Sequence, residues 1–501
     1  MFKKPKKFYI TTPIYYVNDR PHLGHAYTTI AADVLKRYRV LRSDRVFLLT
    51  GTDEHGAKIE AAAEKKGQTP QQLCNENAEI FKETWKGLNV SYDNFIRTTD
   101  NRHIKTVKKI LEILHKKGFI YKGTYEGLYC RGCEQYKTDS DLIDGKCSEH
   151  KIEPELIKEE SYLFKLSQFQ DELIKKIENN EFEIAPEERK NEALNFLRQG
   201  LKDISISRQK VKWGIPLPFD KNFTAYVWVD AFLNYLTGLN WEGNPQKLPE
   251  FWPSDLQLMG KDILRVHATI WPALLLSLGI PLPKKIFVHG YFTLNGQKMS
   301  KSLGNVIWPD EMVKKFGVDA TRYLLLTACH FGQDGDISWE KLTEKYNADL
   351  ANGVGNLINR VLTLIEKKFD GKIPKSSKSE PDLLIEKINN YDKLLTDLKI
   401  DQVLKEIMSI CSDLDNRIDK EKIYQADSLI LSDALYIFAE TIRIWAWLIS
   451  PFLPETADKI FEQLGLDPKK EKKKKFEDAI KWGGLKPGTK IKKGKPLFPR
   501  I

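Results

Sequence analysis

The chain has 501 residues, too many for one compact core, so two to four domains are expected. Hydrophobic residues make up 41% of it, but its longest apolar stretches are shorter than a bilayer-spanning helix, which argues against an integral membrane protein. The net charge of +10 suits a polyanionic partner such as RNA without demonstrating one. Of the six cysteines three are clustered and three are isolated, which argues against a secreted disulfide framework and favours a reducing cytoplasm.

The first hundred residues are predicted to alternate strands and helices. Residues 7–12 are rich in β-branched and aromatic side chains, as in a buried strand, and residues 24–41 carry apolar side chains near helical spacing. Residues 45–50 form a second predicted strand, which runs into a polar loop at 51–56. Strand, helix and strand in this order predict a parallel sheet with crossover helices.

The rest of the pattern predicts an insertion and a helical bundle. Between about residues 121 and 203, cysteines, glycines and short polar runs replace the alternation of strands and helices. The alternation resumes in three later segments, 223–230, 255–260 and 285–290. After about residue 340 strands disappear, and long amphipathic helical segments are expected to form the bundle.

The tetrapeptide His22-Leu23-Gly24-His25 lies where the first strand gives way to the helix. Gly24 has no Cβ, so an adenine ring or a phosphate can lie against the backbone. The helix start offers unpaired N–H groups and the positive end of its dipole. His22 and His25 share one helical face and can both donate to phosphate oxygens. Alone the motif is weak, because two histidines near a turn are as often solvent-facing or structural.

A second motif follows the last predicted strand of the α/β unit, and it reads Lys298-Met299-Ser300-Lys301-Ser302. Two lysines spaced by three can converge on a triphosphate and compensate the negative charge that builds up as pyrophosphate leaves. In isolation, an exposed loop of lysine and serine is the competing interpretation. The order of the two motifs around one α/β unit favours a nucleotide site.

Together, HLGH and KMSKS resemble the two signature sequences of class I aminoacyl-tRNA synthetases. Residues 9–27 and 50–56, the latter reading TGTDEHG, resemble the methionyl-tRNA synthetase family in particular, and the similarity extends over nearly the whole chain. The resemblance implies a Rossmann-type catalytic fold, formation of methionyl-adenylate from methionine and ATP, and transfer of methionine to the 3′-terminal adenosine of its tRNA.

On this resemblance, the expected fold class is an α/β Rossmann-type parallel-sheet catalytic domain with a zinc-binding insertion, followed by an all-α helical bundle. The expected domains are the first half of the catalytic domain at 1–120, an inserted connective domain at 121–207, the second half of the catalytic domain at 208–291, a linker domain with KMSKS at 292–350, and an anticodon-binding bundle with a C-terminal tail at 351–501.

The resemblance also assigns the nucleotide site. The expected catalytic residues are His22, His25, Lys298 and Lys301. The expected ATP-binding set consists of these four with Gly24, Gly260, Lys261, Asp262, His289, Met299, Ser300 and Ser302. Mg²⁺ is expected to accompany ATP. No protein nucleophile is needed, since positioning and charge stabilisation supply the acceleration.

Selecting methionine requires an apolar and aromatic pocket that suits a thioether. By resemblance, Asp53 pairs with the substrate ammonium, and the pocket is lined by Ile14, Tyr16, Trp228, Tyr235, Ile263, His267 and Trp271. Aromatic residues at such spacing are also typical of core packing. Arg208 is expected to pair with Asp262 in support of the pocket. Phe232 departs from the pattern, because some relatives carry proline there.

Two half-sites in the insertion predict one structural Zn²⁺. Cys130-x-x-Cys133 and Cys147-x-x-His150 are separated by thirteen residues, so thiolates and an imidazole can meet at one tetrahedral ion. A redox CxxC and unrelated cysteines are the competing interpretations. Four protein ligands leave no open position, so the ion would organise the insertion rather than take part in chemistry.

The helical bundle is expected to read the anticodon of methionine tRNA, including the initiator. Asn356 and Arg360 match family positions that bond to anticodon bases, and Tyr424 stands near the place of a stacking tryptophan. Ordinary exposed polar residues are the competing interpretation. The lysine run 469–475 is expected to be solvated surface, with RNA contact as the alternative. Many bacterial relatives continue into an OB-fold module that this sequence lacks, so we expect a cytoplasmic monomer, with any such module absent or supplied in trans.

Rival functions fit less well. Synthetases for leucine, isoleucine or valine carry a larger editing insertion than the interval between His25 and Lys298 allows, and a cysteine-specific relative would hold zinc in its amino acid pocket. A non-catalytic RNA-binding relative should have lost signature residues. A simple nucleotidyltransferase would explain HxGH but not KMSKS followed by a bundle.

Overall fold

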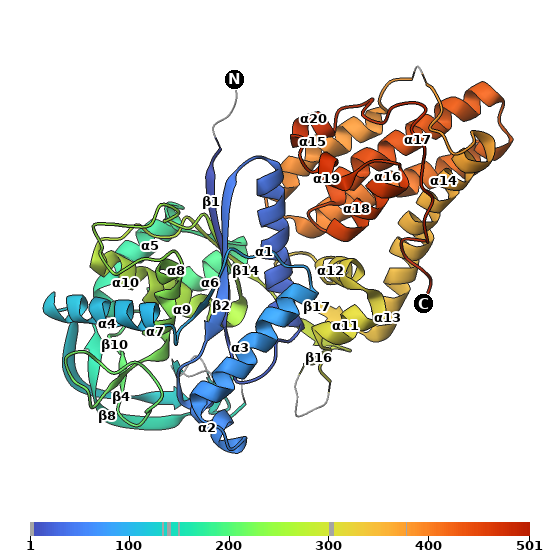
Figure 1. Ribbon diagram of the computed structural model, residues 1–501. Coiled ribbons are helices and arrows are strands. Elements are labelled where there is room, and N and C mark those ends of the chain that lie inside the picture. The colour runs from blue at the N-terminus through green and yellow to red at the C-terminus, as the bar shows by residue number, and fades with distance from the viewer. Residues whose placement is uncertain (1–4, 133–134, 138–141, 149–150, 300–304, 377) are drawn as a thin grey trace.

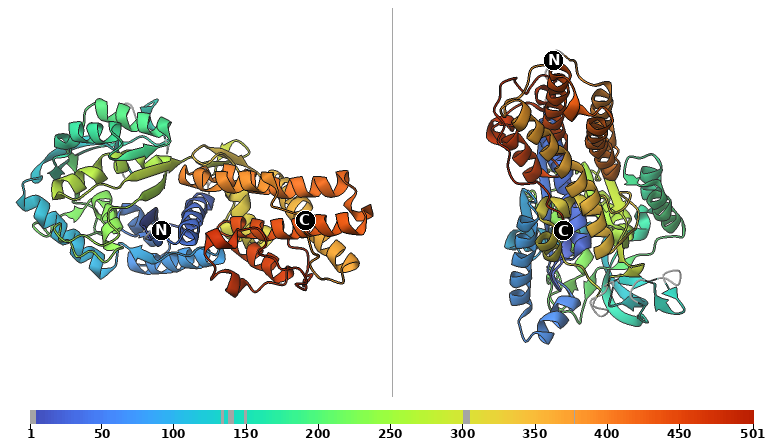
Figure 2. Two further views of the ribbon diagram at one scale, coloured as in Figure 1. Left: turned by 90° about the horizontal axis from the view of Figure 1, so that it is seen from above. Right: turned by 90° about the vertical axis from the view of Figure 1, so that its right-hand side faces the viewer.

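The computed structural model describes residues 5–501 apart from 133–134, 138–141, 149–150, 300–304 and 377. Within this part of the chain, an α/β body and a helical bundle lie side by side, with helix α1 (Leu23–Leu41) between them (Figure 1). The two parts occupy opposite ends of the molecule when it is seen from above (Figure 2, left). Among the described helices, none is long and apolar enough to cross a membrane.

The α/β body is built on a six-stranded parallel sheet with the order β3-β2-β1-β13-β14-β9. Its strands are β1 (Lys7–Tyr16), β2 (Arg45–Asp53), β3 (Asn94–Arg97), β9 (Glu183–Ala185), β13 (Leu256–Gly260) and β14 (Lys285–His289). The chain fills one side of β1 first and the other side later, so the strand order reverses between β1 and β13. The predicted parallel sheet is confirmed, and its edge strand β9 comes from the stretch assigned to the insertion.

Neighbouring residues of each central strand enter different cores, as the two-residue period of a strand requires. Ile10, Leu48 and Leu258 pack in the core on the α1 side. Tyr9, Leu49 and Met259 pack in the core on the opposite side. The helices around the sheet are α2 (Ala57–Lys65), α3 (Pro70–Gly87), α4 (Asn101–Lys116), α5 (Gln170–Glu178), α6 (Glu187–Arg198), α7 (Val227–Phe232), α8 (Asn234–Thr237), α9 (Leu264–Ala268) and α10 (Ile270–Leu278).

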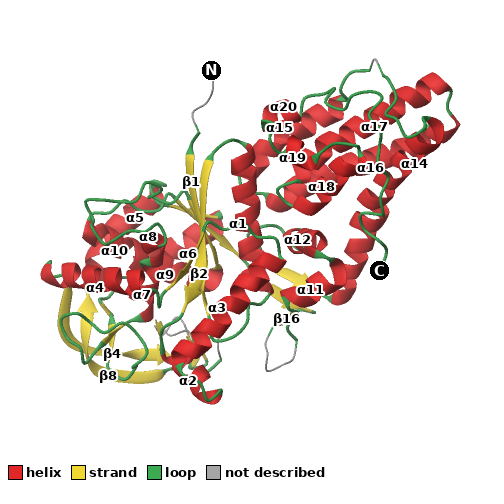
Figure 3. Cartoon of the chain, viewed as in Figure 1, coloured by secondary structure: helices red, strands yellow, loops and turns green. Residues whose placement is uncertain are grey.

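A smaller antiparallel sheet, β10-β8-β4-β5, stands at the far end of the body from the bundle (Figure 3). Its strands and those of the adjoining hairpins are β4 (Ile120–Cys130), β5 (Gln135–Lys137), β6 (Leu142–Ile143), β7 (Lys146–Cys147), β8 (Glu155–Phe164), β10 (Ile204–Ser205), β11 (Ser207–Arg208) and β12 (Thr224–Ala225). Strands β4 and β8 pair over ten residue positions. The single-turn helix η2 (Leu166–Phe169) leads from β8 into α5.

The segment between the sheet and the bundle contains β15 (Phe292–Leu294), β16 (Gln297–Lys298), β17 (Gly335–Ile337), α11 (Pro309–Phe316), α12 (Val318–Leu326) and α13 (Trp339–Lys345). The bundle that follows contains η5 (Tyr346–Gly355), α14 (Asn356–Lys368), α15 (Asp382–Thr396), α16 (Ile400–Lys420), η6 (Ile423–Gln425), α17 (Ser428–Ile449), α18 (Pro454–Gln463), α19 (Pro468–Glu471) and α20 (Phe476–Ala479). The bundle core is continuous with the core on the α1 side of the sheet.

Candidate active site

Four neighbouring strands of the central sheet, β2, β1, β13 and β14, end side by side at the carboxyl-terminal edge of the sheet. The last residue of each strand is expected in the site. Asp53 ends β2, Gly260 ends β13 and His289 ends β14. The register places Tyr16 beside Asp53 and Gly260 beside His289. Because the strand order reverses between β1 and β13, this edge is where open α/β sheets bind their ligands.

The HLGH turn begins α1 with a reciprocal histidine cap. His22 is the N-cap residue, and its Nδ1 accepts a hydrogen bond from the Gly24 N–H at 3.1 Å. His25 Nδ1 in turn accepts from the His22 N–H at 3.4 Å, and the two rings stack with centroids 3.6 Å apart. A Cβ on Gly24 would lie 3.0 Å from the His22 ring, so this position favours glycine. Both histidines are therefore fixed at the positive end of the α1 dipole.

His289 ties the end of β14 to the HLGH turn. Its Nε2 lies 2.6 Å from Thr28 Oγ1, which itself lies 3.0 Å from the Gly24 carbonyl oxygen. Its Nδ1 donates to the Gly290 carbonyl oxygen at 2.8 Å. Burial lowers the pKa of His289 to about 4, partly opposed by that backbone hydrogen bond, so the ring is neutral at pH 7.

The expected aromatic pocket residues form one cluster on α7–α10. The Tyr235 ring lies 5.5 Å from Trp271, and the Trp228 ring lies 6.4 Å from His267. Phe232 stacks on Trp271 at 5.7 Å and meets the edge of His267 at 4.9 Å. The side chain that departs from the family pattern is therefore part of the cluster.

A polar chain fixes the orientation of His267 within the cluster. The Tyr235 hydroxyl lies 2.9 Å from His267 Nε2, and His267 Nδ1 donates to the Ile263 carbonyl oxygen at 2.8 Å. Burial lowers the pKa of His267 to about 4, against the opposing effect of the backbone hydrogen bond. The ring is neutral at pH 7, with its proton on Nδ1, so Nε2 accepts from Tyr235. A neutral pocket suits the uncharged thioether of methionine.

A buried carboxylate that was not expected from the sequence joins the TDEHG loop to the pocket helices. Asp230 accepts from His55 Nδ1 at 2.6 Å and from His103 Nε2 at 2.8 Å. Burial raises the pKa of Asp230, but the charges and hydrogen bonds of the two histidines outweigh it and lower that pKa to about 2. Asp53 stands two residues before His55, so the network anchors the loop that carries the expected ammonium partner.

After β13, residues Lys261–Ile263 form the short helix η3. Lys261 Nζ contacts both Asp334 oxygens at 2.7 and 2.8 Å, and the Asp334 carboxylate also accepts from the Tyr291 N–H at 2.7 Å. Arg208 lies over the Tyr226 ring at 4.3 Å and donates to the Ser207 carbonyl oxygen at 2.8 Å. The expected pairing of Arg208 with Asp262 stays a prediction.

Parts of two expected sites lie outside the described residues. Ser300, Lys301 and Ser302 of KMSKS are among them, as are Cys133 and His150 of the zinc site. The described zinc candidates, Cys130 at the end of β4 and Cys147 at the end of β7, are both buried. The described cysteines form no disulfide, and the described residues contain no cluster of three potential metal ligands.

The expected anticodon residues lie on α14 and η6 of the bundle. Asn356 is exposed at the start of α14. Arg360, one turn later, binds Asp415 and Asp419 of α16 at 2.6 and 2.5 Å. Tyr424 on η6 is 45% exposed, as a stacking residue would need to be. Their contact with RNA stays a prediction.

The sequence as a whole matches proteins of known activity. The family described as tRNA synthetases class I (M) matches residues 8–151 and 137–362, and the anticodon-binding domain of tRNA ligase matches residues 383–483. A methionine–tRNA ligase of Caldanaerobacter subterraneus subsp. tengcongensis is 46% identical over 99% of this chain and 79% of that protein. The chain belongs to the methionine–tRNA ligase family.

Other members of the methionine–tRNA ligase family support the assignment. The Streptomyces coelicolor member is 42% identical over 99% of this chain and 97% of that protein. The structure of Mycobacterium tuberculosis methionyl-tRNA synthetase in complex with methionyl-adenylate matches with a TM-score of 0.91 and 37% identity, over 99% of this chain and 100% of that one. The chain is thus a class I aminoacyl-tRNA synthetase that activates methionine and charges tRNA with it. The predicted family, fold class and enzyme type are confirmed, whereas zinc binding by the insertion stays a prediction.

Proposed function

We propose that methionine activation takes place at the edge where β1, β2, β13 and β14 end. The observation that carries this proposal is the convergence of Asp53, the HLGH turn, Gly260 and His289 on that edge. ATP binds with its adenine near Gly24 and its phosphates between the HLGH turn and KMSKS. When bound with ATP, Mg²⁺ would neutralise part of the phosphate charge.

In the first step, the methionine carboxylate attacks the α-phosphorus in line and pyrophosphate leaves. His22 and His25 stabilise the negative charge that develops, together with Lys298 and Lys301. The capped and stacked histidine pair is held in place before ATP arrives, so little reorganisation is needed. The ribose hydroxyl of the tRNA then displaces AMP from methionyl-adenylate and forms an ester with methionine.

Methionine lies with its ammonium at Asp53 and its side chain among Trp228, Tyr235, His267 and Trp271. Ile14, Tyr16 and Ile263 complete the pocket, and Arg208 supports it through Asp262. The neutral His267 ring and the surrounding aromatic rings suit a side chain without charge. A hydroxylated or charged side chain would lose its hydration there without recovering full hydrogen bonding.

Replacing Tyr235 by phenylalanine tests the pocket. The change leaves His267 Nε2 without its hydroxyl donor, so the KM for methionine should rise about tenfold in ATP–pyrophosphate exchange, while the KM for ATP stays within about twofold. Tyr121→Phe is the matched control, because that hydroxyl binds Asp203 in the insertion. Equal methionine KM values in the two variants would place the pocket elsewhere.

We assign one structural Zn²⁺ to Cys130, Cys133, Cys147 and His150. Two buried thiols at strand ends, with no disulfide among the described cysteines, are the donor type that zinc prefers. The backbone of Cys147 is also held by two hydrogen bonds, since its N–H donates to the Ile152 carbonyl oxygen and its own carbonyl accepts from the Lys151 N–H. When bound, the ion would cross-link the loops after β4 and β7.

Metal analysis of purified protein tests the zinc assignment. About one zinc per chain is expected in the unmodified protein, and clearly less in a Cys130→Ser variant, because three ligands bind more weakly than four. Cys411→Ser is the control, since this buried thiol lies in the bundle on α16. Full zinc content in Cys130→Ser would contradict the assignment.

We infer that the bundle reads the anticodon of tRNA(Met), including the initiator, through Asn356, Arg360 and Tyr424. Arg360 would exchange an aspartate partner for a base, whereas Tyr424 offers an exposed ring. Within the lysine run, Lys472 and Lys474 pair with Asp458 and Glu471, which favours a solvated surface. We place the enzyme in the cytoplasm as a monomer.

A further inference from the structure

Helix α1 connects the HLGH turn directly to the helical bundle. Its 19 residues span about 28 Å, from the cap at His22 to Leu41. At its far end, the Tyr38 hydroxyl donates to Asp392 Oδ1 at 2.9 Å. Arg42, the C-cap residue, pairs with Asp392 at 3.1 Å and with Glu477 at 2.9 Å. One rigid element therefore carries the expected catalytic histidines at one end and contacts α15 near the other.

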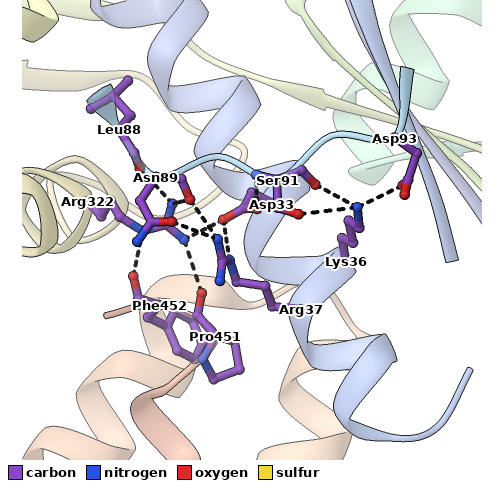
Figure 4. A network of polar contacts seen from close by, with 10 residues as sticks. All are labelled: Asp33, Lys36, Arg37, Leu88, Asn89, Ser91, Asp93, Arg322, Pro451 and Phe452. Carbon is purple, nitrogen blue, oxygen red and sulfur yellow. Dashed lines mark hydrogen bonds and ion pairs between the residues drawn. The ribbon is translucent and has the colours of Figure 1, made fainter. Parts of the chain in front are cut away.

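The middle of α1 is held by one buried arginine from α12 (Figure 4). Arg322 is completely buried, and its Nη2 contacts Asp33 Oδ2 at 2.7 Å. The same guanidinium donates to the carbonyl oxygens of Phe452 and Pro451, at 2.7 and 3.1 Å, in the turn between α17 and α18. A fourth contact reaches the Leu88 carbonyl oxygen at 3.1 Å, at the end of α3. A single side chain thus joins the catalytic body, the linking segment and the bundle.

The partner of Arg322 is equally constrained. Asp33 is completely buried, and its Oδ2 also accepts from Arg37 Nε at 2.7 Å, while its Oδ1 accepts from the Ser91 N–H at 2.8 Å. Burying an ion pair is a weak source of stability compared with apolar packing. A planar guanidinium with several fixed donors is well suited to holding separate segments in one geometry. The arrangement therefore favours a positioning role over a purely stabilising one.

We propose that Arg322 is a positioning residue that couples tRNA binding on the bundle to the placement of His22 and His25 through Asp33 and α1. The proposal rests on the proposed reading of the anticodon by the bundle. A displacement of the bundle moves the carbonyl groups of residues 451 and 452. The rigid guanidinium group of Arg322 transmits that displacement to α1. Because α1 is fixed at Asp33, the HLGH turn moves with it.

The test compares two reactions of the same enzyme, of which only aminoacylation uses tRNA. Arg322→Lys keeps the positive charge but removes the planar guanidinium group with its several fixed donors. We expect kcat for aminoacylation to fall about tenfold or more, while the KM for tRNA and the rate of ATP–pyrophosphate exchange stay within about twofold. A residue that merely held the bundle in place would instead raise the KM for tRNA or lower both reactions together.

Arg443→Lys is the matched control. Arg443 is equally buried and pairs with Glu440 at 2.7 Å, but its remaining contacts are to the Ala479 and Lys481 carbonyl oxygens within the same bundle. We expect its loss to change aminoacylation and exchange by the same factor. Comparing the two arginine variants separates two effects. Both variants alter a buried arginine, but only Arg322→Lys alters a side chain that joins the catalytic body to the bundle.

A milder variant decides the question if Arg322→Lys does not fold. Asp392→Asn weakens the contacts at the exposed end of α1 and should lower aminoacylation kcat selectively, by a smaller factor. Equal losses in both reactions, or no loss, would overturn the proposal.

Binding of an anticodon stem-loop to the unmodified protein is measured alongside. Absence of binding there identifies failure of the proposed anticodon reading, whereas normal binding without a selective loss identifies failure of the coupling.

Discussion

Replacing His25 by alanine is expected to lower the rate of methionine-dependent ATP–pyrophosphate exchange by about 100- to 1,000-fold, the effect of removing one preorganised donor from a transition state. The same change removes the acceptor for the His22 N–H and the ring that stacks on His22, so both signature histidines are affected. The KM for methionine should change little, because the aromatic cluster lies on α7–α10. Lys301→Ala is expected to act in the same direction.

His115→Ala serves as the control for this prediction. That ring stacks on Phe219 at 4.0 Å, away from the strand ends that form the site. Exchange should stay within about threefold of the unmodified enzyme. A His25→Ala variant that keeps a comparable rate would show that the histidine pair has no part in stabilising the phosphate charge.

Acidification below about pH 6.5 is expected to destabilise the catalytic body steeply. Burial lowers the pKa of both His267 and His289 to about 4, against an ordinary value of 6.5. Between these pH values the two histidines are protonated in the unfolded chain but stay neutral in the folded chain. The stability that is fully present above pH 6.5 is therefore lost as the pH falls toward 4. A shift of this size corresponds to about 3 kcal/mol for each histidine.

Urea unfolding followed by tryptophan fluorescence at a series of pH values measures this loss. Replacing His267 by glutamine should remove about half of the dependence between pH 6.5 and 4, because His289 continues to titrate. The Asp230 carboxylate has its pKa lowered to about 2, so its contribution is lost only below pH 4 and does not confuse the comparison. An unchanged free energy of unfolding between pH 7 and 5 would contradict the buried, neutral state of both rings.

The central sheet and the position of its site could be predicted because the relevant signals are local. Runs of β-branched, aromatic and apolar side chains along β1 and β2 mark strands with two buried faces, and the HLGH turn is marked by a glycine and two histidines within four positions. The bundle was likewise predictable from helical spacing. These features depend on residues close together in sequence.

Other features depend on partners that sequence spacing does not bring together. His103 and Asp230 are 127 positions apart, and Arg322 and Asp33 are 289 apart. Nothing in the neighbourhood of His103 on α4 distinguishes it from a surface histidine, because its role arises from packing against α7 and α8. The aspartate in the VWVDAF segment was the available signal, since a carboxylate between apolar residues requires a buried partner. In the sequence Phe232 stands out only as a departure from the family pattern, whereas the structure shows that it packs against both His267 and Trp271.

The measurement that tests the central claim most directly is ATP–pyrophosphate exchange with purified protein and Mg²⁺, run with each of the twenty amino acids in turn. Exchange supported by methionine alone is the predicted result, since it requires the nucleotide site and the aromatic pocket to act together. Exchange with a different amino acid, or with none of them, would contradict the assignment of this site to methionine activation.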